Sequence, residues 1–183
     1  NTAAYTNVDE AEDDHDTAYA VNATAVGLLA KACQQNNIPL LHISTDYVFD
    51  GTKETPYTEN DPINPINVYG KSKAEGERLI RKVLDKHIIL RTSWIFSKGY
   101  KNFVTTIRRL GKNLNELKVI NDQRGGPTSA DCIAKVLMDI ACKNIKGIFI
   151  PWGTYHYSGS PAVSRYEFAE AIFEAEKGEK RPI

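Results

Sequence analysis

The sequence predicts an α/β protein with a parallel β-sheet, on two observations. Two short apolar runs, residues 40–43 and 87–92, have the length and composition of buried strands. The second run is nearly all apolar, which is typical of a parallel strand that is covered on both faces. Stretches with the helical period precede and separate these runs, so helices and strands alternate along the chain.

Composition narrows the class further. The chain has 183 residues, 42% of them hydrophobic, enough for one domain, or one and part of another. Its formal net charge is zero, which gives no support for a nucleic-acid partner or a polybasic membrane patch. No apolar run is long enough to span a bilayer, and the start lacks the basic-then-apolar order of a signal peptide. Three scattered cysteines form no metal-binding spacing, so we expect reduced thiols in a cytoplasmic protein without a metal site.

The first predicted helix follows an acidic stretch, residues 9–16. Acidic side chains are favourable near a helix N-terminus, because they complement the helix dipole. Asp16 or Thr17 is the expected N-cap, and the helix should run to about Gln35. Its expected buried positions are Val21, Ala25, Leu28, Leu29, Ala32 and Cys33.

Hydroxyl side chains follow the first strand at the point where it ends. Ser44, Thr45 and Asp46 come directly after the apolar run, and Asp50-Gly51 then marks a turn. The carboxyl ends of strands are where open α/β sheets bind ligands. The alternative is that Ser44 and Thr45 only satisfy backbone groups at the strand end.

A second helix carries a tyrosine and a lysine at helical spacing. Asn67 is a plausible N-cap, and Tyr69 and Lys73, four residues apart, share one face. A nearby ammonium lowers the pKa of a phenol, which could then donate a proton to a substrate oxygen. The alternative is an exposed face on which Lys73 pairs with Glu75 or Glu77. Leu79, Ile80, Val83 and Leu84 supply the expected buried stripe.

The second half continues the alternation of helices and strands. We expect a helix over 102–110 ended by Gly111, a strand over 118–120 and a tight turn over 122–127. A helix capped by Thr128 or Ser129 should run through Cys142. A strand broken by Pro151-Trp152-Gly153 should cover 147–150 and 155–157. A capping box, Ser164 to Glu167, should open the last helix.

Several motifs in order resemble the extended short-chain dehydrogenase/reductases, and within them the dTDP-4-dehydrorhamnose reductase family. The matching stretches are Ser44 to Gly51, Asn67 to Lys73, Ala3 to Thr6, Val8-Asp9, Arg91 to Trp94, Asn102-Phe103, Asn121 to Gln123 and Gly126 to Thr128. They keep the family's order and similar spacing to about Lys177. The resemblance implies a partial Rossmann-like, doubly wound parallel sheet with helices on both faces, plus part of a small substrate-binding region. It places the cofactor-binding part in 1–150 and part of the substrate-binding region in 151–183.

The resemblance also implies an activity and a set of site residues. The reaction would be NADPH- or NADH-dependent reduction of the 4-keto group of dTDP-4-dehydro-6-deoxy-L-mannose to dTDP-L-rhamnose. The implied catalytic residues are Tyr69, Lys73 and Thr45. The implied cofactor-binding residues are Ala3, Ala4, Tyr5, Ser44, Tyr69 and Lys73. The implied substrate-binding residues are Thr45, Asp46, Trp94 and Asn102, and Asn22 matches an asparagine that supports the active site.

Two departures from the family pattern qualify this expectation. No glycine-rich phosphate-binding turn occurs, so we expect a fragment that lacks the N-terminal cofactor-binding units and the C-terminal end. Such a fragment should expose a strand edge. Some relatives bind Mg²⁺ through glutamates at a dimer interface, whereas the matching position here is Asp131, which leaves the metal and a homodimer open.

Two alternative functions remain at this point. A nucleotide-sugar epimerase or dehydratase of the same superfamily would share Tyr69 and Lys73. Dehydratases generally add acidic residues beside the threonine, where this chain has Asp46 but no glutamate after it. The other alternative is a non-catalytic regulatory subunit, which would resemble the beta subunit of methionine adenosyltransferase.

Overall fold

The computed structural model describes residues 1–175, and these divide into two compact units. The first comprises residues 1–92 and 147–157, and the second comprises 93–146 and, within the described part, 158–175. The two units are defined by the contacts within each of them. The boundary expected at residue 150 separates a cofactor-binding part from a substrate-binding part, and it stays a prediction. Among the described residues, no helix has both the length and the apolar character needed to cross a membrane.

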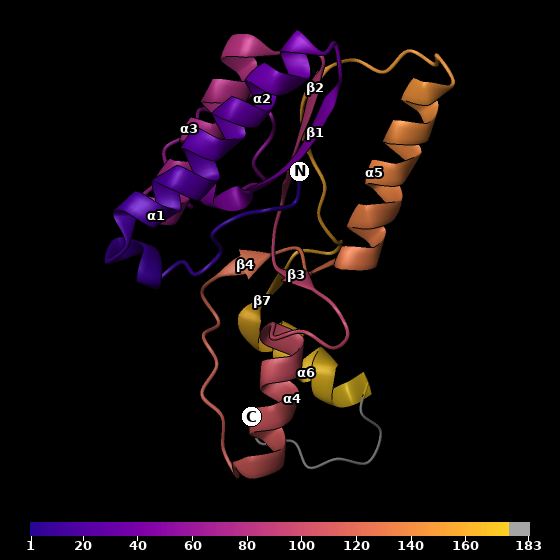
Figure 1. The fold of residues 1–183 in the computed structure, drawn as a ribbon. Coiled ribbons are helices and arrows are strands. Elements are labelled where there is room, and N and C mark those ends of the chain that lie inside the picture. Colours follow the sequence, from indigo (N-terminus) through magenta and orange to yellow (C-terminus); the bar gives the residue numbers. More distant parts are fainter. Residues whose placement is uncertain (176–183) are drawn as a thin grey trace. The chain divides into compact units, whose positions relative to one another are not determined.

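The first unit is built on a parallel sheet in the order β1-β2-β6. Its strands are β1 (Leu40–Thr45), β2 (His87–Thr92) and β6 (Gly153–His156). The helices α2 (Ala25–Gln35) and α3 (Val68–Val83) lie side by side against β1 and β2 (Figure 1). The predicted α/β class with a parallel sheet and flanking helices is thus confirmed.

The register of β1 and β2 brings their ends together. The strands pair from Leu40 opposite His87 to Thr45 opposite Thr92, so the two threonines lie side by side at the carboxyl edge. The core between sheet and helices is formed by Val26, Ala30, Cys33, Leu40, Ile80, Leu84 and Ile89.

The other edge of β1 is next to the first residue of the chain. The backbone nitrogen of Asn1 donates to the Leu41 carbonyl, and the Asn1 carbonyl accepts from the Ile43 N–H. Leu41 and Ile43 are the residues on either side of His42, and bonds from one residue to both of them follow the pattern of a parallel ladder. Asn1 therefore occupies part of the edge that was expected to be exposed.

The first helical run departs from the sequence expectation at its start and on its buried face. It consists of α1 (His15–Tyr19), the π-helical η2 (Ala20–Thr24) and α2, and its N-cap is Asp14. The expected stripe was wrong at Ala25, Leu28, Leu29 and Ala32, which are exposed. The helix turns another face to the core, one position away from the most apolar residues. The buried positions are Ala18, Asn22, Ala23, Val26, Gly27, Ala30 and Cys33.

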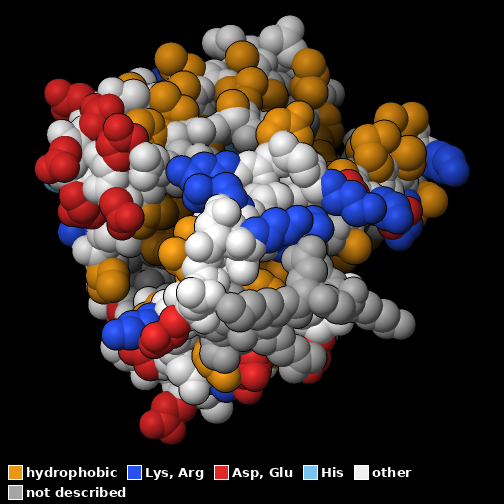
Figure 2. Space-filling view, turned by 90° about the horizontal axis from the view of Figure 1, so that it is seen from below, with side chains coloured by type: hydrophobic (Ala, Val, Ile, Leu, Met, Phe, Trp, Pro, Cys, Tyr) orange, Lys and Arg blue, Asp and Glu red, His pale blue; other side chains and the backbone are white. Residues whose placement is uncertain are grey.

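Acidic residues surround the entry to this run. The short 3-10 helix η1 (Glu10–Glu12) precedes α1, and Asp14 caps α1 by accepting from the Thr17 N–H at 3.3 Å. Red acidic side chains gather on the left of the view in Figure 2, the same side on which Figure 1 draws α1. They form the solvated helix entrance that the sequence predicts.

The second unit contains two short strand pairs and three helices. Strand β3 (Ile95–Phe96) pairs in parallel with β5 (Thr128–Ser129), and β4 (Arg124–Gly125) pairs antiparallel with β7 (Val163–Ser164). The helices are α4 (Phe103–Asn113), α5 (Ala130–Ile145) and α6 (Arg165–Ala175). Its apolar core joins α4 to α6 through Ile107, Ala169, Ile172 and Phe173.

Several expectations for the second half were wrong. Residues 118–120 and 147–150 form no strand, and the turn expected over 122–127 contains β4. Val119 packs against the α4–α6 core. Gly111 does not end its helix but lies inside α4, where the Phe173 ring packs against it. The predicted capping box is confirmed: the Ser164 hydroxyl accepts from the Glu167 N–H, and the Glu167 carboxylate accepts from the Ser164 N–H.

Candidate active site

The site begins with a threonine at the carboxyl end of β1. Thr45 is the last residue of the strand and the N-cap of the 3-10 helix η3 (Asp46–Val48). Its hydroxyl accepts from the Tyr47 N–H at 3.1 Å and donates to the Asp46 carboxylate at 3.1 Å. The turn therefore fixes the position of the Thr45 oxygen at the edge of the sheet where open α/β proteins bind ligands.

The start of α3 is fixed against this turn. Asn67 caps the helix by accepting from the Gly70 N–H at 2.7 Å, and Glu12 accepts from the Val68 N–H at 2.7 Å. Gly70 is required for the close approach, because a Cβ there would lie 2.2 Å from the Tyr47 carbonyl oxygen. The helix N-terminus thus lies directly on the turn that holds Thr45.

This packing brings Tyr69 to Thr45. The Thr45 hydroxyl lies close enough to the Tyr69 hydroxyl to affect its pKa, and the Tyr69 ring packs edge to face against Tyr47. Burial raises the pKa of Tyr69 to about 12, and the neighbouring Thr45 hydroxyl opposes that rise only in part. Tyr69 is therefore a protonated phenol at neutral pH, able to donate its proton.

Lys73 lies one turn further along the same helix but is directed to the sheet. Its ammonium donates to the Ile43 carbonyl at 2.7 Å and lies 3.4 Å from Nε2 of His42. Burial lowers the pKa of Lys73 to about 8, while the negative charge of Glu77 opposes this shift. The expected lowering of the Tyr69 pKa by Lys73 was wrong: burial raises that pKa, and the nearby Asp46 and Tyr47 raise it further.

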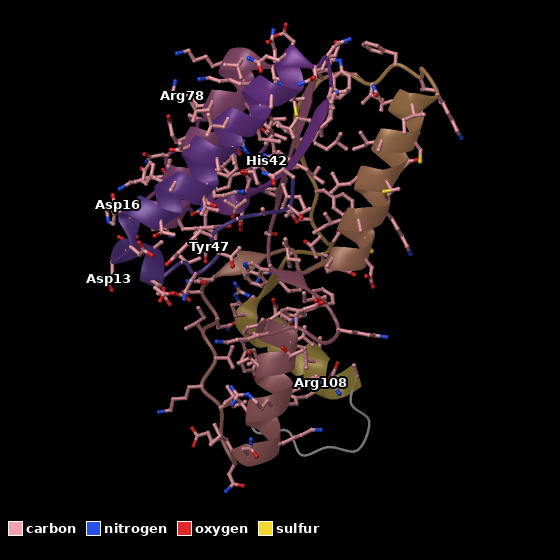
Figure 3. All side chains as sticks on the ribbon, viewed as in Figure 1. Asp13, Asp16, His42, Tyr47, Arg78 and Arg108 are labelled. Carbon is pink, nitrogen blue, oxygen red and sulfur yellow. The ribbon has the colours of Figure 1, made fainter. Side chains whose placement is uncertain are left out.

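His42 is a buried neighbour of Lys73 that the sequence did not reveal. It is 1% exposed, and Figure 3 shows it inside the layer of strands and helices. Its Nδ1 lies 3.0 Å from the Asn1 side-chain nitrogen. Burial first, and then the charge of Lys73, lower the pKa of His42 to about 3, so it is neutral. An inward position in an apolar run was its only signal in the sequence.

The N-terminal segment is joined to α3 through Asn22. This fully buried side chain accepts from the Tyr5 N–H at 2.9 Å and donates to the Tyr5 carbonyl at 3.0 Å. It also donates to Ser72, whose hydroxyl donates to the Tyr69 carbonyl. Asn22 thus fixes the position of the N-terminal segment at Tyr5 relative to the helix that carries Tyr69.

The remaining residues expected to bind the cofactor lie along the same unit. Ala3 is exposed and Ala4 half-buried beside Tyr5, whose hydroxyl has no hydrogen-bond partner among the described residues. Ser44 is buried, and its hydroxyl donates to Glu77 at 2.6 Å rather than facing outward. The hydrogen bond from Ser44 to Glu77 is therefore a structural contact between β1 and α3.

Sequence reasoning also missed Thr92. Its hydroxyl oxygen is buried without a hydrogen-bond partner among the described residues, and it lies opposite Thr45 in the sheet register. A buried polar atom without a partner is unusual and occurs preferentially at functional sites. Its position at a strand end, like that of Thr45, was the available signal.

The two other predicted substrate-binding residues belong to the second unit. Trp94 has a backbone φ of 46°, and the Arg165 guanidinium lies 3.7 Å from its ring centre. Asn102 is the N-cap of α4: it accepts from the Thr105 N–H and donates to the carbonyls of Ser97 and Tyr100. The Asn102 side chain is therefore engaged in a local cap, and its substrate role stays a prediction.

Residues 1–175 contain no cluster of three metal-ligating side chains. Asp131, the position matched to a metal-binding glutamate, is an exposed residue in the first turn of α5.

Known proteins of similar sequence and structure identify the family of this chain. A family described as the RmlD substrate binding domain matches residues 1–183. The chain belongs to this family, that of the dTDP-4-dehydrorhamnose reductases. A reductase of that name from Aggregatibacter actinomycetemcomitans is 52% identical over 180 residues, which are 98% of this chain and 61% of the relative. One from Sinorhizobium fredii is 45% identical over 93% of this chain and 58% of its own length.

Solved structures agree with the sequence comparisons. The dTDP-4-dehydrorhamnose reductase of Bacillus anthracis, crystallised with NADP, superposes with a TM-score of 0.90 at 38% identity. That match covers 98% of this chain and 62% of the solved one. The chain thus spans about three-fifths of the length of the relatives that it matches.

Proposed function

We propose that the protein to which this chain belongs reduces the 4-keto group of dTDP-4-dehydro-6-deoxy-L-mannose to give dTDP-L-rhamnose. The approach of Tyr69, at the start of α3, to Thr45, at the end of β1, with Lys73 one turn away, is the observation that carries the proposal. Membership of the reductase family supplies the substrate class. The protein would work in the cytoplasm, where its free cysteines stay reduced.

The chain's residues suit the nicotinamide end of NADPH or NADH. Lys73 carries three N–H donors, of which one is used by the Ile43 carbonyl, and the Tyr5 hydroxyl has no partner within residues 1–175. When bound, the cofactor supplies a hydride. Lys73 and Tyr69 would hold its ribose hydroxyls, and Ala3 and Ala4 would allow its close approach.

The chain's own residues supply the proton and the stabilisation of charge. Tyr69 donates its proton to the substrate oxygen as that oxygen becomes an alkoxide. Thr45 donates a hydrogen bond to the same oxygen, which stabilises the developing charge. The high pKa of Tyr69 suits this direction, because the phenol is protonated before the reaction. Asp46 beside Thr45, and Trp94 and Asn102 in the second unit, are the proposed substrate contacts.

The test is Tyr69→Phe in the full-length protein. With dTDP-4-dehydro-6-deoxy-L-mannose and NADPH, turnover should fall by about 100-fold or more, because the proton donor is removed. Tyr100→Phe is the matched control, since Tyr100 is 79% exposed. Near-normal turnover in Tyr69→Phe would sink the mechanism. Product analysis with other nucleotide sugars would expose an epimerase or dehydratase.

A further inference from the structure

The face of α3 that carries Tyr69 and Lys73 also carries Glu77, one turn further on. Glu77 has no exposed surface. Its carboxylate accepts from the Arg91 guanidinium at 2.9 and 2.7 Å, from the Ser44 hydroxyl at 2.6 Å and from Arg81 at 3.0 Å. A carboxylate in this environment would have a raised pKa from burial alone, but these hydrogen bonds, Arg91 foremost, hold the pKa of Glu77 below its usual range.

We propose that Glu77 is a positioning residue, which holds the helix that carries Tyr69 and Lys73 against the strand that carries Thr45. The inference rests on the function proposed above, because it assigns Glu77 a part in the same site. Its first support is geometric, because Glu77 connects α3 to β1 through Ser44 and to β2 through Arg91.

The geometric part follows from two neighbours in sequence. Ser44, which donates to Glu77, directly precedes Thr45, while Glu77 lies two helical turns beyond Tyr69. The bond from Ser44 thus couples the strand end that carries Thr45 to the helix that carries Tyr69. The paired bonds from Arg91 add orientation, because two parallel N–H donors fix the plane of a carboxylate. Together they define how α3 is rotated and displaced along β1.

The electrostatic part concerns the charged groups around Lys73. On the sheet side it lies against neutral His42, and on its own helix the nearest charged group is Glu77, one turn further on. Arg91 of β2 lies behind Glu77. Glu77 is the group that favours the ammonium form of Lys73, against the burial that disfavours it. Removing its charge should therefore lower the pKa of Lys73.

The chain provides a matched control on the same helix. Glu75 pairs with Arg78 at 2.6 Å, where the Arg78 side chain is 56% exposed and the Glu75 side chain 33%, and Figure 3 shows Arg78 on the outer side of the helices. Exposed pairs of this kind contribute little to stability. Glu75→Gln makes the same chemical change as Glu77→Gln two residues away, without touching the strands.

The experiment compares Glu77→Gln with Glu75→Gln in the full-length protein. Glu77→Gln should lower kcat by about 100-fold through misplacement of Tyr69. It should also move the alkaline limb of the kcat profile to lower pH by about 1 unit, because Lys73 loses its proton earlier. Glu75→Gln should change neither. Wild-type kcat and an unmoved limb in folded Glu77→Gln would overturn the proposal.

Two further measurements keep the test decisive. If Glu77→Gln does not fold, the double variant Glu77→Met with Arg91→Met replaces the buried pair by apolar groups, an exchange that folded proteins often tolerate. A folded double variant with wild-type kcat and pH profile would overturn the inference, whereas a lowered kcat with a shifted limb supports it. NMR titration of ¹³C-labelled Lys73 reads its pKa without substrate. A drop in Glu77→Gln but not Glu75→Gln supports the inference even if the ketosugar is not reduced, and an unchanged pKa contradicts it.

Discussion

The two units of this chain differ in the charged groups that their cores contain. In the first unit, charged and polar side chains are buried beside the apolar core: Glu77, Arg91, Lys73, His42 and Asn22 are each at most 5% exposed. In the second unit, the α4–α6 core consists of aliphatic and aromatic groups such as Ile107, Ile172 and Phe173. Two ion pairs among its described residues, Arg124 with Glu167 and Lys143 with Asp139, lie on the surface.

Under the proposed function, the first unit carries the chemistry at the expense of stability. Burying ionised groups costs free energy that hydrogen bonds only partly offset, whereas an apolar core stabilises in proportion to its buried area. Substitutions in the second core should therefore destabilise, while some in the first should stabilise and abolish activity. The following predictions test that contrast.

The largest expected effect lies in the apolar core. Phe173 is 3% exposed and packs on Gly111 of α4. Phe173→Ala should lower the free energy of unfolding by about 3–5 kcal/mol, because the cavity cannot fully collapse. Hydrogen exchange should accelerate in α4 and α6 more than in β1 and β2. Phe149→Ala, at a position that is 84% exposed, is the control. A loss below about 1 kcal/mol for Phe173→Ala would contradict a tightly packed second core.

The next effect tests the contact of α3 with η2 and α2. A Cβ at Gly76 would lie 2.1 Å from the backbone oxygen of Asn22, which cannot move without displacing the helix. Gly76→Ala should therefore cost up to about 3 kcal/mol, even though alanine favours helices. Gly27→Ala is the comparison, since its new methyl group would meet only the Leu79 side chain, 3.0 Å away. Equal urea midpoints for the two variants would show that the helices can shift apart freely.

Lys73 provides the converse case, a substitution that should stabilise. Its pKa falls from 10.5 to about 8 on folding, chiefly through burial. Lys73 is still an ammonium at pH 7, and burying that charge costs free energy on folding. Stability from this group is therefore present above pH 10.5 and lost as pH falls through 8. Lys73→Met should raise the free energy of unfolding at pH 7 by about 2 kcal/mol and abolish turnover. Lys71→Met, on the exposed face, is the control, and a destabilised Lys73→Met would refute the argument.

How far sequence reasoning reaches follows from the same contrast. Local signals were sufficient for the Asn67 cap, the Ser164–Glu167 box and the shared face of Tyr69 and Lys73, because these depend on residues within one or two turns. The direction of Lys73 was not predictable, since the Ile43 carbonyl that binds it belongs to a distant strand. Glu77 likewise reads as a surface charge until Arg91 is placed beside it. The apolar residues Leu28 and Leu29 were expected to be buried and are exposed.

The smallest effect concerns pH and His42. Its pKa falls from 6.5 to about 3 on folding, through burial first and then the charge of Lys73. As pH drops below 6.5, His42 binds a proton in the unfolded chain but not in the folded chain, so the free energy of unfolding declines. This one group contributes a slope of about 1.4 kcal/mol for each pH unit between 6.5 and the acid range. His42→Gln should flatten that slope in urea unfolding between pH 5 and 6.5, above the range in which most carboxylates titrate. His15→Gln, at an exposed position, is the matched control. An unchanged slope in His42→Gln would mean that the polar core of the first unit admits a charged imidazole, and that this core is more hydrated than its burial indicates.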